Sequence, residues 1–343
     1  MRAFLSSIFC LTWVPHLAIC LGLGVALPAS AIEGNDPGLW VNEWPKTDFD
    51  QASISFDEIK DGGPPKDGIP PIDDPVFIRI EESDLPDIEP VIGLIIDGTA
   101  RAYPIRILIW HEIVNDQIGD VPIAVTFCPL CNTGIVFDRR IAGDVLDFGT
   151  TGKLRNSDLV MYDRQTESWW QQFMGEAIVG EMTGQTLTSV PARLESFANF
   201  KARAAETSAG SGWVLVPNNE VIRAYGITPY VGYDSLEKPF LYNGPLPTQV
   251  APLARVVRVG DSAWSLDLVK DKGEIMIDET LRLRWDSGQA SALDRSAIAQ
   301  GLDVGNVVVE EKAEDGAWVD VVYTVDFAFA FRAFYPDTPI HTE

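Results

Sequence analysis

The stretch AVTFCPLCNTGIVFDRR, residues 124–140, reads as two β-strands joined by a turn that contains two cysteines. β-Branched and aromatic residues, which favour strands, flank the cysteines on both sides. Asn132 and Gly134 favour a turn and do not begin a good helix. The segment therefore predicts a β-hairpin with Cys128 and Cys131 at its turn, and not the strand-to-helix junction of a thioredoxin-type dithiol.

Segments of the same kind surround this hairpin from about residue 76 onward. They are short and apolar, and turn signals such as Asp97-Gly98, residues 118–120 and residues 142–144 separate them. Only two stretches, Ile105 to Asp116 and Arg193 to Ala204, show the apolar spacing of a helix. The sequence therefore predicts a mainly β fold, of the α+β class with few short helices.

Two pairs of segments resemble each other in the same order along the chain. Residues 254–275 resemble residues 92–113, and residues 319–336 resemble residues 121–138. We interpret this as an internal duplication that gives two related β-rich lobes, with the general likeness of β-hairpins as the alternative. The second copy has no cysteine and no histidine opposite His111, so any chemistry is expected in the first lobe.

The first 31 residues have the features of a cleavable secretory signal peptide, with Arg2 before a long apolar run and small residues at a cleavage site. A retained membrane anchor is the alternative, because the run approaches the length of a bilayer span. Residues 32–75 are rich in proline and glycine and predict an extended arm. The first lobe, with the cysteines, then covers residues 76–245, and the second covers residues 246–343.

The net charge of −24 argues against nucleic acid and anionic membrane surfaces as partners. No other apolar run is long enough to span a bilayer, so we expect a periplasmic or extracellular protein without a stable membrane span after cleavage. Patterns for a phosphate-binding loop, a dinucleotide fingerprint and haem attachment are missing. We therefore expect neither a nucleotide nor a covalent haem.

After cleavage the chain keeps few soft metal ligands, namely Cys128, Cys131, His111 and His341. Two thiolates at a tight turn suit one metal ion, and His111 is the available third ligand. Such a Cys2His set predicts zinc or copper, with copper(I) favoured by soft thiolates. The sequence offers three candidates for a fourth ligand without singling one out: Glu112, Asp138 and Met161.

Two other interpretations of the cysteine pair remain open at this point. Cys128 and Cys131 could form a thiol-disulfide redox couple, although the βαβ context of such couples is missing. They could also form a plain disulfide, which an exported protein permits, although so short a loop adds little stability.

A second group of polar residues lies between Thr150 and Gly180 and could orient a small-molecule ligand. Alternation along a strand would place Asp158 and Tyr162 on one face. For each of these residues a purely structural ion pair or turn contact is the competing interpretation. The candidates are Arg155, Asp158, Tyr162, Asp163 and Arg164.

Several of these segments resemble, in order, the signature blocks of the bacterial and archaeal family called domain of unknown function 3179 (DUF3179). The blocks are GGPPKDGIPPIDDPVF, ARAYPIRILIWHEIVND, VTFCPLCNTGIVFDRR, LRNSDLVMYDRQTESWWQQFMGEAIVG and YVGYDSLEKPFLYNG. The resemblance implies that exported members are common and that the Cys-Pro-Leu-Cys and Trp-His-Glu blocks typify the group. It implies no activity.

These observations predict an exported protein with a metal site at Cys128, Cys131 and His111. It would act as a metal-dependent oxidoreductase or as a metal carrier. The alternatives are a thiol-disulfide redox protein and a non-catalytic ligand-binding domain with a structural disulfide.

Overall fold

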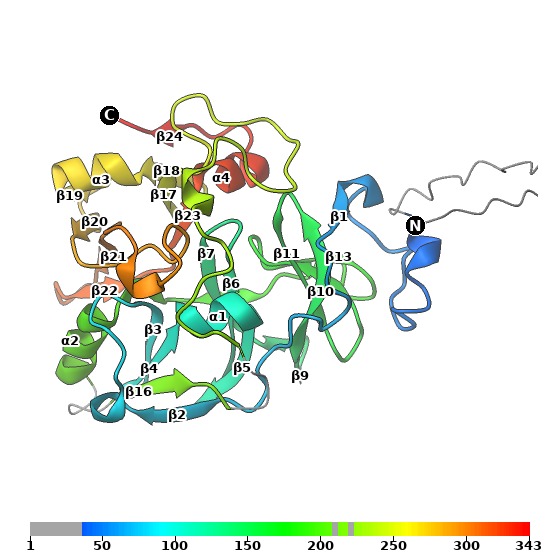
Figure 1. The fold of residues 1–343 in the computed structure, drawn as a ribbon, viewed down its shortest axis with the longest axis horizontal. Coiled ribbons are helices and arrows are strands. Elements are labelled where there is room, and N and C mark those ends of the chain that lie inside the picture. Colours follow the sequence, from blue (N-terminus) through cyan, green and yellow to red (C-terminus); the bar gives the residue numbers. More distant parts are fainter. Residues whose placement is uncertain (1–35, 208–211, 219–222) are drawn as a thin grey trace, which may run out of the picture. The chain divides into compact units, whose positions relative to one another are not determined.

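A computed structural model describes residues 36–207, 212–218 and 223–343, and the predicted signal peptide lies outside them. Within this part the protein is mainly β, with four short helices (Figure 1), as the sequence predicts. The helices are α1 (Ile105–His111), α2 (Phe197–Thr207), α3 (Leu266–Lys272) and α4 (Ala328–Phe334).

Five larger sheets contain most of the strands, and each is described here in spatial order. The arm sheet contains β1 (Ile59–Asp61), β10 (Phe148–Arg155), β11 (Asp158–Asp163), β12 (Trp169–Gln171) and β13 (Glu176–Val179). The cysteine sheet contains β14 (Thr188–Val190), β7 (Thr133–Asp138), β6 (Val121–Cys128) and β5 (Ile113–Ile118). The β3 sheet contains β15 (Arg193–Ser196), β3 (Pro90–Ile96), β4 (Thr99–Pro104), β16 (Gly212–Val216) and β2 (Val76–Arg79).

The remaining strands come mainly from the C-terminal third of the chain. The β17 sheet contains β23 (Thr324–Phe327), β17 (Arg255–Val259), β18 (Ser262–Ser265) and β24 (Ile340–His341). The β20 sheet contains β19 (Glu274–Met276), β20 (Leu281–Asp286), β21 (Asn306–Lys312) and β22 (Trp318–Asp320). A separate two-stranded hairpin contains β8 (Arg140–Ile141) and β9 (Asp144–Val145).

The five sheets are arranged as a five-bladed, β-propeller-like ring, and not as the two lobes that the sequence predicts. The reason lies in the packing of the apolar side chains. One continuous core includes Ile92 of β3, Phe127 of β6, Phe148 of β10 and Phe327 of β23. The C-terminal strand β23 thus shares this core with the cysteine sheet, although residues after 245 also form smaller clusters of their own, one of them around Val257, Leu283 and Val309.

The predicted internal duplication is not established by the structure. The first pair of similar segments does fold alike, since β3, β4 and α1 follow in the same order as β17, β18 and α3. The second pair differs, because β6 continues into the strand β7 whereas β23 continues into the helix α4.

Both predicted helices differ from the observed ones at the end that enters a sheet. The helix expected over Ile105–Asp116 ends at His111, and its last residues form β5, in which Ile113 pairs with Thr126 of β6. The helix expected from Arg193 begins at Phe197, because the first four residues form β15 and pair with β3. Pairing with a neighbouring strand outweighs the helical spacing at both places.

The described part of the proline-rich segment, from Asp36 to Pro75, packs along the arm sheet. Ile59 in β1 pairs with Arg155 in β10, and Trp44 and Ile59 are fully buried. The Lys66 ammonium lies 4.3 Å from the centre of the Trp44 ring and 2.7 Å from the Glu167 carboxylate. This segment therefore forms one edge of the arm sheet and reaches the hairpin that carries Asp158.

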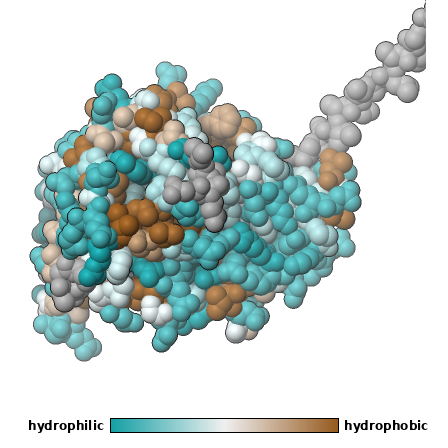
Figure 2. All heavy atoms as spheres, turned by 60° about the horizontal axis from the view of Figure 1, so that its bottom comes forward, coloured by the Kyte–Doolittle hydropathy of each residue, from teal (hydrophilic) through white to brown (hydrophobic). Residues whose placement is uncertain are grey.

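Hydrophilic residues predominate on the face drawn in Figure 2, where apolar residues form small separate groups. Among the described residues, no helix combines the length and the apolar character that crossing a membrane requires.

Candidate functional site

The two cysteines lie at the turn of a β-hairpin, as the sequence predicts. β6 ends at Cys128, which pairs with Thr133 at the start of β7. The Cys131 N–H donates to the Cys128 carbonyl over 3.3 Å, and Asn132 has a positive φ of 54°, which asparagine tolerates well. The chain thus reverses tightly and brings both cysteine side chains to the same end of the cysteine sheet.

Strand β23 fixes this turn from the other side. The Phe327 N–H donates to the Cys131 carbonyl over 2.8 Å, and the Asn132 side-chain amide donates to the Val325 carbonyl over 2.8 Å. The Thr133 hydroxyl donates to the Asp326 carboxylate over 2.8 Å. These bonds hold the cysteine turn in one conformation within the described structure.

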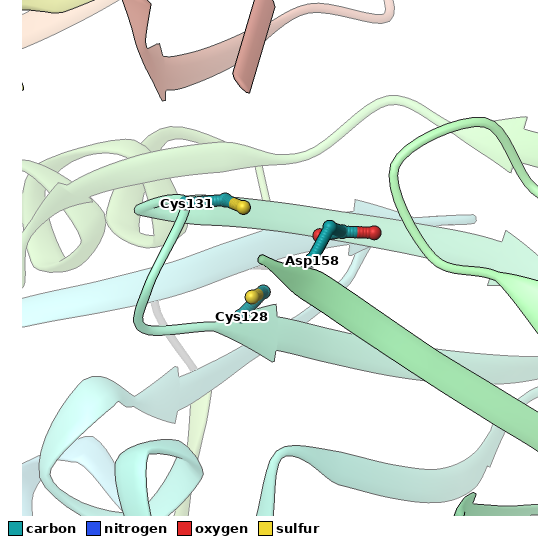
Figure 3. Close-up of side chains that lie close together, drawn as sticks. All are labelled: Cys128, Cys131 and Asp158. Carbon is teal, nitrogen blue, oxygen red and sulfur yellow. The ribbon is translucent and has the colours of Figure 1, made fainter. Parts of the chain in front are cut away.

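A second hairpin brings Asp158 to the cysteines. β10 and β11 are joined by Asn156 and Ser157, which both have positive φ, 54° and 65°, as in a type I′ turn. Asp158 is the first residue of β11, and the Ser157 carbonyl accepts from the thiols of Cys128 (3.8 Å) and Cys131 (3.5 Å). The two sulfurs and a carboxylate oxygen of Asp158 all lie within 4.8 Å of one another (Figure 3).

The two oxygens of the Asp158 carboxyl differ in their surroundings. Oδ2 accepts from the Gln171 side-chain amide over 2.6 Å and from the Phe173 N–H over 2.9 Å. Oδ1 is buried and has no hydrogen-bond partner within the described structure. A buried acceptor without a partner is destabilising and uncommon, so Oδ1 is available to a cation or a donor that enters the site.

The site is closed to solvent. The exposed fraction is 2% for Cys128 and 0% for both Cys131 and Asp158. Burial raises the pKa of Asp158 to about 7 and, together with the Asp158 charge, raises the pKa of Glu112 to about 8. Burial also raises the pKa of both thiols, which are free cysteines here and not a disulfide.

This donor set suits one soft or borderline metal ion. Metal–sulfur bonds of about 2.3 Å in a tetrahedral site place two sulfur ligands roughly 3.8 Å apart. The two sulfurs and the Asp158 oxygen lie within 4.8 Å of one another, so they would move little to bind one ion. Binding would release the protons that the buried groups carry without a metal. Thiolates with a carboxylate are compatible with zinc, and the sulfur pair alone with copper(I).

His111, predicted as the third metal ligand, is engaged elsewhere. Its Nδ1 lies 2.8 Å from the Pro70 carbonyl and its Nε2 lies 2.8 Å from the Tyr225 hydroxyl. Burial lowers its pKa. The structure therefore brings together two of the three predicted metal ligands and places Asp158, predicted as a residue that orients a small molecule, where His111 was expected.

The three residues named as possible fourth ligands lie in different environments. Glu112 is close enough for its charge to contribute to the raised pKa of Cys128. Asp138 pairs with Arg140 over 2.5 Å, which lowers the pKa of its carboxyl. Met161 is fully buried in the apolar core. Of the three, Glu112 is the one whose charge acts on the cysteine site.

The other predicted ligand-orienting residues have partners within the chain. Arg155 bonds Glu58 and Gln171. Tyr162 donates to Asp67 over 2.5 Å, Arg164 donates to Asp73 over 2.6 Å, and Asp163 accepts from Trp170 over 2.9 Å. Three of them bond residues of the arm, and Asp163 connects β11 to β12 within the arm sheet.

The sequence also contains a signal for the position of Asp158, in the two residues that precede it. Asn156 and Ser157 stand between two strand-forming runs, a pattern typical of a two-residue hairpin turn. The contacts of Gln171 and of the Phe173 N–H with Asp158 have no comparable signal, because they depend on how β12 meets β11.

Comparison with known proteins gives one match. A family model described as "Protein of unknown function (DUF3179)" matches residues 66–338, which is most of the chain. None of the curated proteins and none of the solved structures matches it.

Proposed function

Because the chain belongs to the DUF3179 family of proteins of unknown function, we propose a function from its own buried site. The protein is an exported metal-binding protein that holds one zinc or copper ion with Cys128, Cys131 and Asp158. Two observations support this most directly: the two sulfurs and one carboxylate oxygen of Asp158 converge in a buried site, and Asp158 Oδ1 has no hydrogen-bond partner in the described chain.

The charges around the site support a cation as the occupant. Asp158 and Glu112 are both buried, and neither forms an ion pair with a described lysine, arginine or histidine. Buried carboxylates are costly unless they are paired or coordinate a metal. A bound cation would lie beside both carboxyl groups and would favour their ionised forms.

The burial of the thiols supports metal retention over thiol-disulfide exchange. Exchange needs an accessible thiolate, and here burial raises the pKa of both thiols and covers both sulfurs. Three protein ligands leave one position of a tetrahedral zinc site open. Because the three residues are buried, solvent and substrate do not reach that position, and we therefore favour a carrier or a structural metal centre over an oxidoreductase.

Metal content is the test of this function. We would purify the chain without residues 1–31, incubate it with zinc or with copper(I) under reducing conditions, remove the excess, and measure metal and free thiols. Wild type should retain about one equivalent of metal. Cys128→Ser and Asp158→Asn should both lose it while keeping the circular dichroism spectrum of wild type.

The matched control is Asp116→Asn. Asp116 is also a buried carboxylate, but its oxygens bond Tyr103, Arg101 and the Gln117 N–H. This variant should retain the metal. Wild-type protein that remains free of both metals, or an Asp158→Asn variant that binds as wild type does, would overturn the three-ligand site.

A further inference from the structure

A chain of polar contacts connects the buried Asp158 to the N-terminal arm. The Gln171 side-chain amide donates to Asp158 Oδ2 over 2.6 Å. The Gln171 Oε1 accepts from Arg155 Nη1 over 3.3 Å. Arg155 in turn donates from Nε (2.8 Å) and Nη2 (2.7 Å) to Glu58 Oε2. Glu58 belongs to the segment before β1, at the outer edge of the arm sheet.

Each side chain in this series of contacts is held in the orientation that its neighbour requires. The other Glu58 oxygen, Oε1, accepts from the Ser55 N–H over 3.0 Å in a capping box, which fixes the carboxylate toward Arg155. Arginine is a donor only, so its contact makes the oxygen of the Gln171 amide face Arg155. The NH2 group of Gln171 must then face Asp158.

The consequence for Asp158 is that one oxygen is saturated and the other is free. Oδ2 accepts two hydrogen bonds, from Gln171 and from the Phe173 N–H, whereas Oδ1 has no partner in the described chain. A carboxylate held in this way offers a single oxygen to an ion. Groups that orient metal ligands from behind commonly change metal affinity tenfold or more when they are replaced.

We propose that Gln171, Arg155 and Glu58 are positioning residues for the metal site, and that the N-terminal arm thereby sets its affinity and coordination geometry. This inference rests on the proposed metal site. Gln171 does not touch the ion; it presents Oδ1 of Asp158 to it. Glu58 acts two contacts further away, so the strength of binding depends on how the arm docks against β10.

Two substitutions separate this role from a general loss of structure. Gln171→Glu has the same shape and keeps an acceptor for Arg155, but it presents an acceptor to Asp158 Oδ2 in place of a donor. Glu58→Gln weakens the contact with Arg155 on a side chain that is 38% exposed. Asp57→Asn is the matched control, since it removes one negative charge from the neighbouring, exposed arm residue.

The experiment uses cobalt(II) as a spectroscopic probe in the chain without residues 1–31. Absorption reports the thiolate-to-cobalt bands and the coordination geometry, competition with a chelator gives the Kd, and the Tm reports folding. Gln171→Glu should weaken binding by roughly tenfold or more and shift the visible bands. Glu58→Gln should shift them in the same direction with a smaller loss, and Asp57→Asn should match wild type.

The two proposals fail in distinguishable ways. If wild type shows no thiolate-to-cobalt bands, the metal site itself is wrong and the positioning role falls with it. If wild type binds cobalt but Gln171→Glu and Glu58→Gln share its Kd and spectrum, the metal site stands and the role of the arm is overturned. A loss of affinity with an unchanged spectrum and a much lower Tm would also overturn it, because that result indicates unfolding.

Discussion

At Asp158 a carboxylic acid is kept where water does not reach it. Its pKa rises to about 7 from an ordinary value of 3.8, chiefly because burial disfavours the charged form. Without a metal, the folded protein must therefore either keep this proton or bear an unpaired buried charge. The contacts from Gln171, the Phe173 N–H and the two thiols offset part of the cost of burying the charged carboxylate, and a bound cation would offset more of it.

This cost predicts how the stability of the metal-free protein depends on pH. A carboxyl whose pKa is higher in the folded than in the unfolded state contributes full stability below about pH 4, and this contribution is lost as the pH rises through about 7. We expect the free energy of unfolding to fall between pH 5 and pH 8 by on the order of a few kcal/mol.

Asp158→Asn should flatten this dependence, since asparagine has no proton to lose. Urea unfolding with a chelator present, at pH 5 and pH 8, measures both proteins. At pH 8 the variant should be at least as stable as wild type even though it no longer binds metal. Equal slopes in the two proteins would contradict this account. Glu112, with a pKa near 8, contributes in the same direction in both.

At the residue level the sequence predicts the cysteine pair but not its partner. Two cysteines three residues apart are readily recognised as candidate metal ligands in a chain with few other soft ligands. The small number of histidines points to His111 as the third ligand, but the sequence does not show that Pro70 and Tyr225 contact both nitrogens of its ring. A Cβ at Gly134 would lie 2.9 Å from the Ile92 side chain, so a larger residue there requires that side chain to shift.

At the level of elements, the type I′ turn of the β10–β11 hairpin decides where Asp158 lies. Both of its residues have positive φ, which asparagine adopts at little cost and serine less readily. Ser157 is also tied down, because its hydroxyl donates to the Phe240 carbonyl over 2.5 Å. The backbone conformation of Asn156 and Ser157 therefore determines the position of Asp158 and, with it, the proposed metal site.

Two substitutions at Asn156 test this dependence. Asn156→Gly should leave the stability within about 0.5 kcal/mol of wild type, because glycine adopts positive φ freely. Asn156→Val should cost about 1–2 kcal/mol and weaken metal binding, because a β-branched residue is strained in this conformation. Urea unfolding and metal titration of both variants provide the measurement, and equal behaviour of the two would contradict the role of the turn.

Hairpins were predictable from the sequence, whereas the ends of the helices were not. The turn signals at Asp97-Gly98, at Gly119 and at Gly143 all join paired strands. Helix α1 ends at His111, before Glu112, whose φ is 59°, although apolar residues continue at helical spacing. What ends it is the pairing of Ile113 with Thr126, and a single segment does not show which strand will be its neighbour.

At the level of the whole molecule, the neighbours of a strand come from distant parts of the chain. β16 lies parallel to β4 and antiparallel to β2, and β24 lies parallel to β18. Alternation and turn signals predict which segments are strands, but they do not predict these pairings. For this reason the mainly β class was predictable and the propeller-like arrangement of the sheets was not.

Export is the prediction that concerns the N-terminal residues. We expect the exported form to begin at Ile32, since the small residues Ala29 and Ala31 precede it in a cleavage pattern. Intact-mass analysis of protein recovered from outside the cytoplasm checks this. Replacing Ala31 with a bulky residue, as in Ala31→Phe, should leave the precursor uncut. A recovered chain that keeps Arg2 would instead indicate a retained anchor.

The hydrogen bonds from β23 to the cysteine turn form only late in the synthesis of the protein. Asn132 and Thr133 reach partners that lie 193 residues further along the chain. A ribosome makes the cysteines long before it makes these partners, and a chain exported from its amino end delivers them in the same order. Until Asp326 and Phe327 arrive, the turn lacks the contacts that hold it in place. The newly made protein thus passes through an interval in which its thiols meet the oxidants and ions of their surroundings, and the arrival of β23 brings that interval to an end.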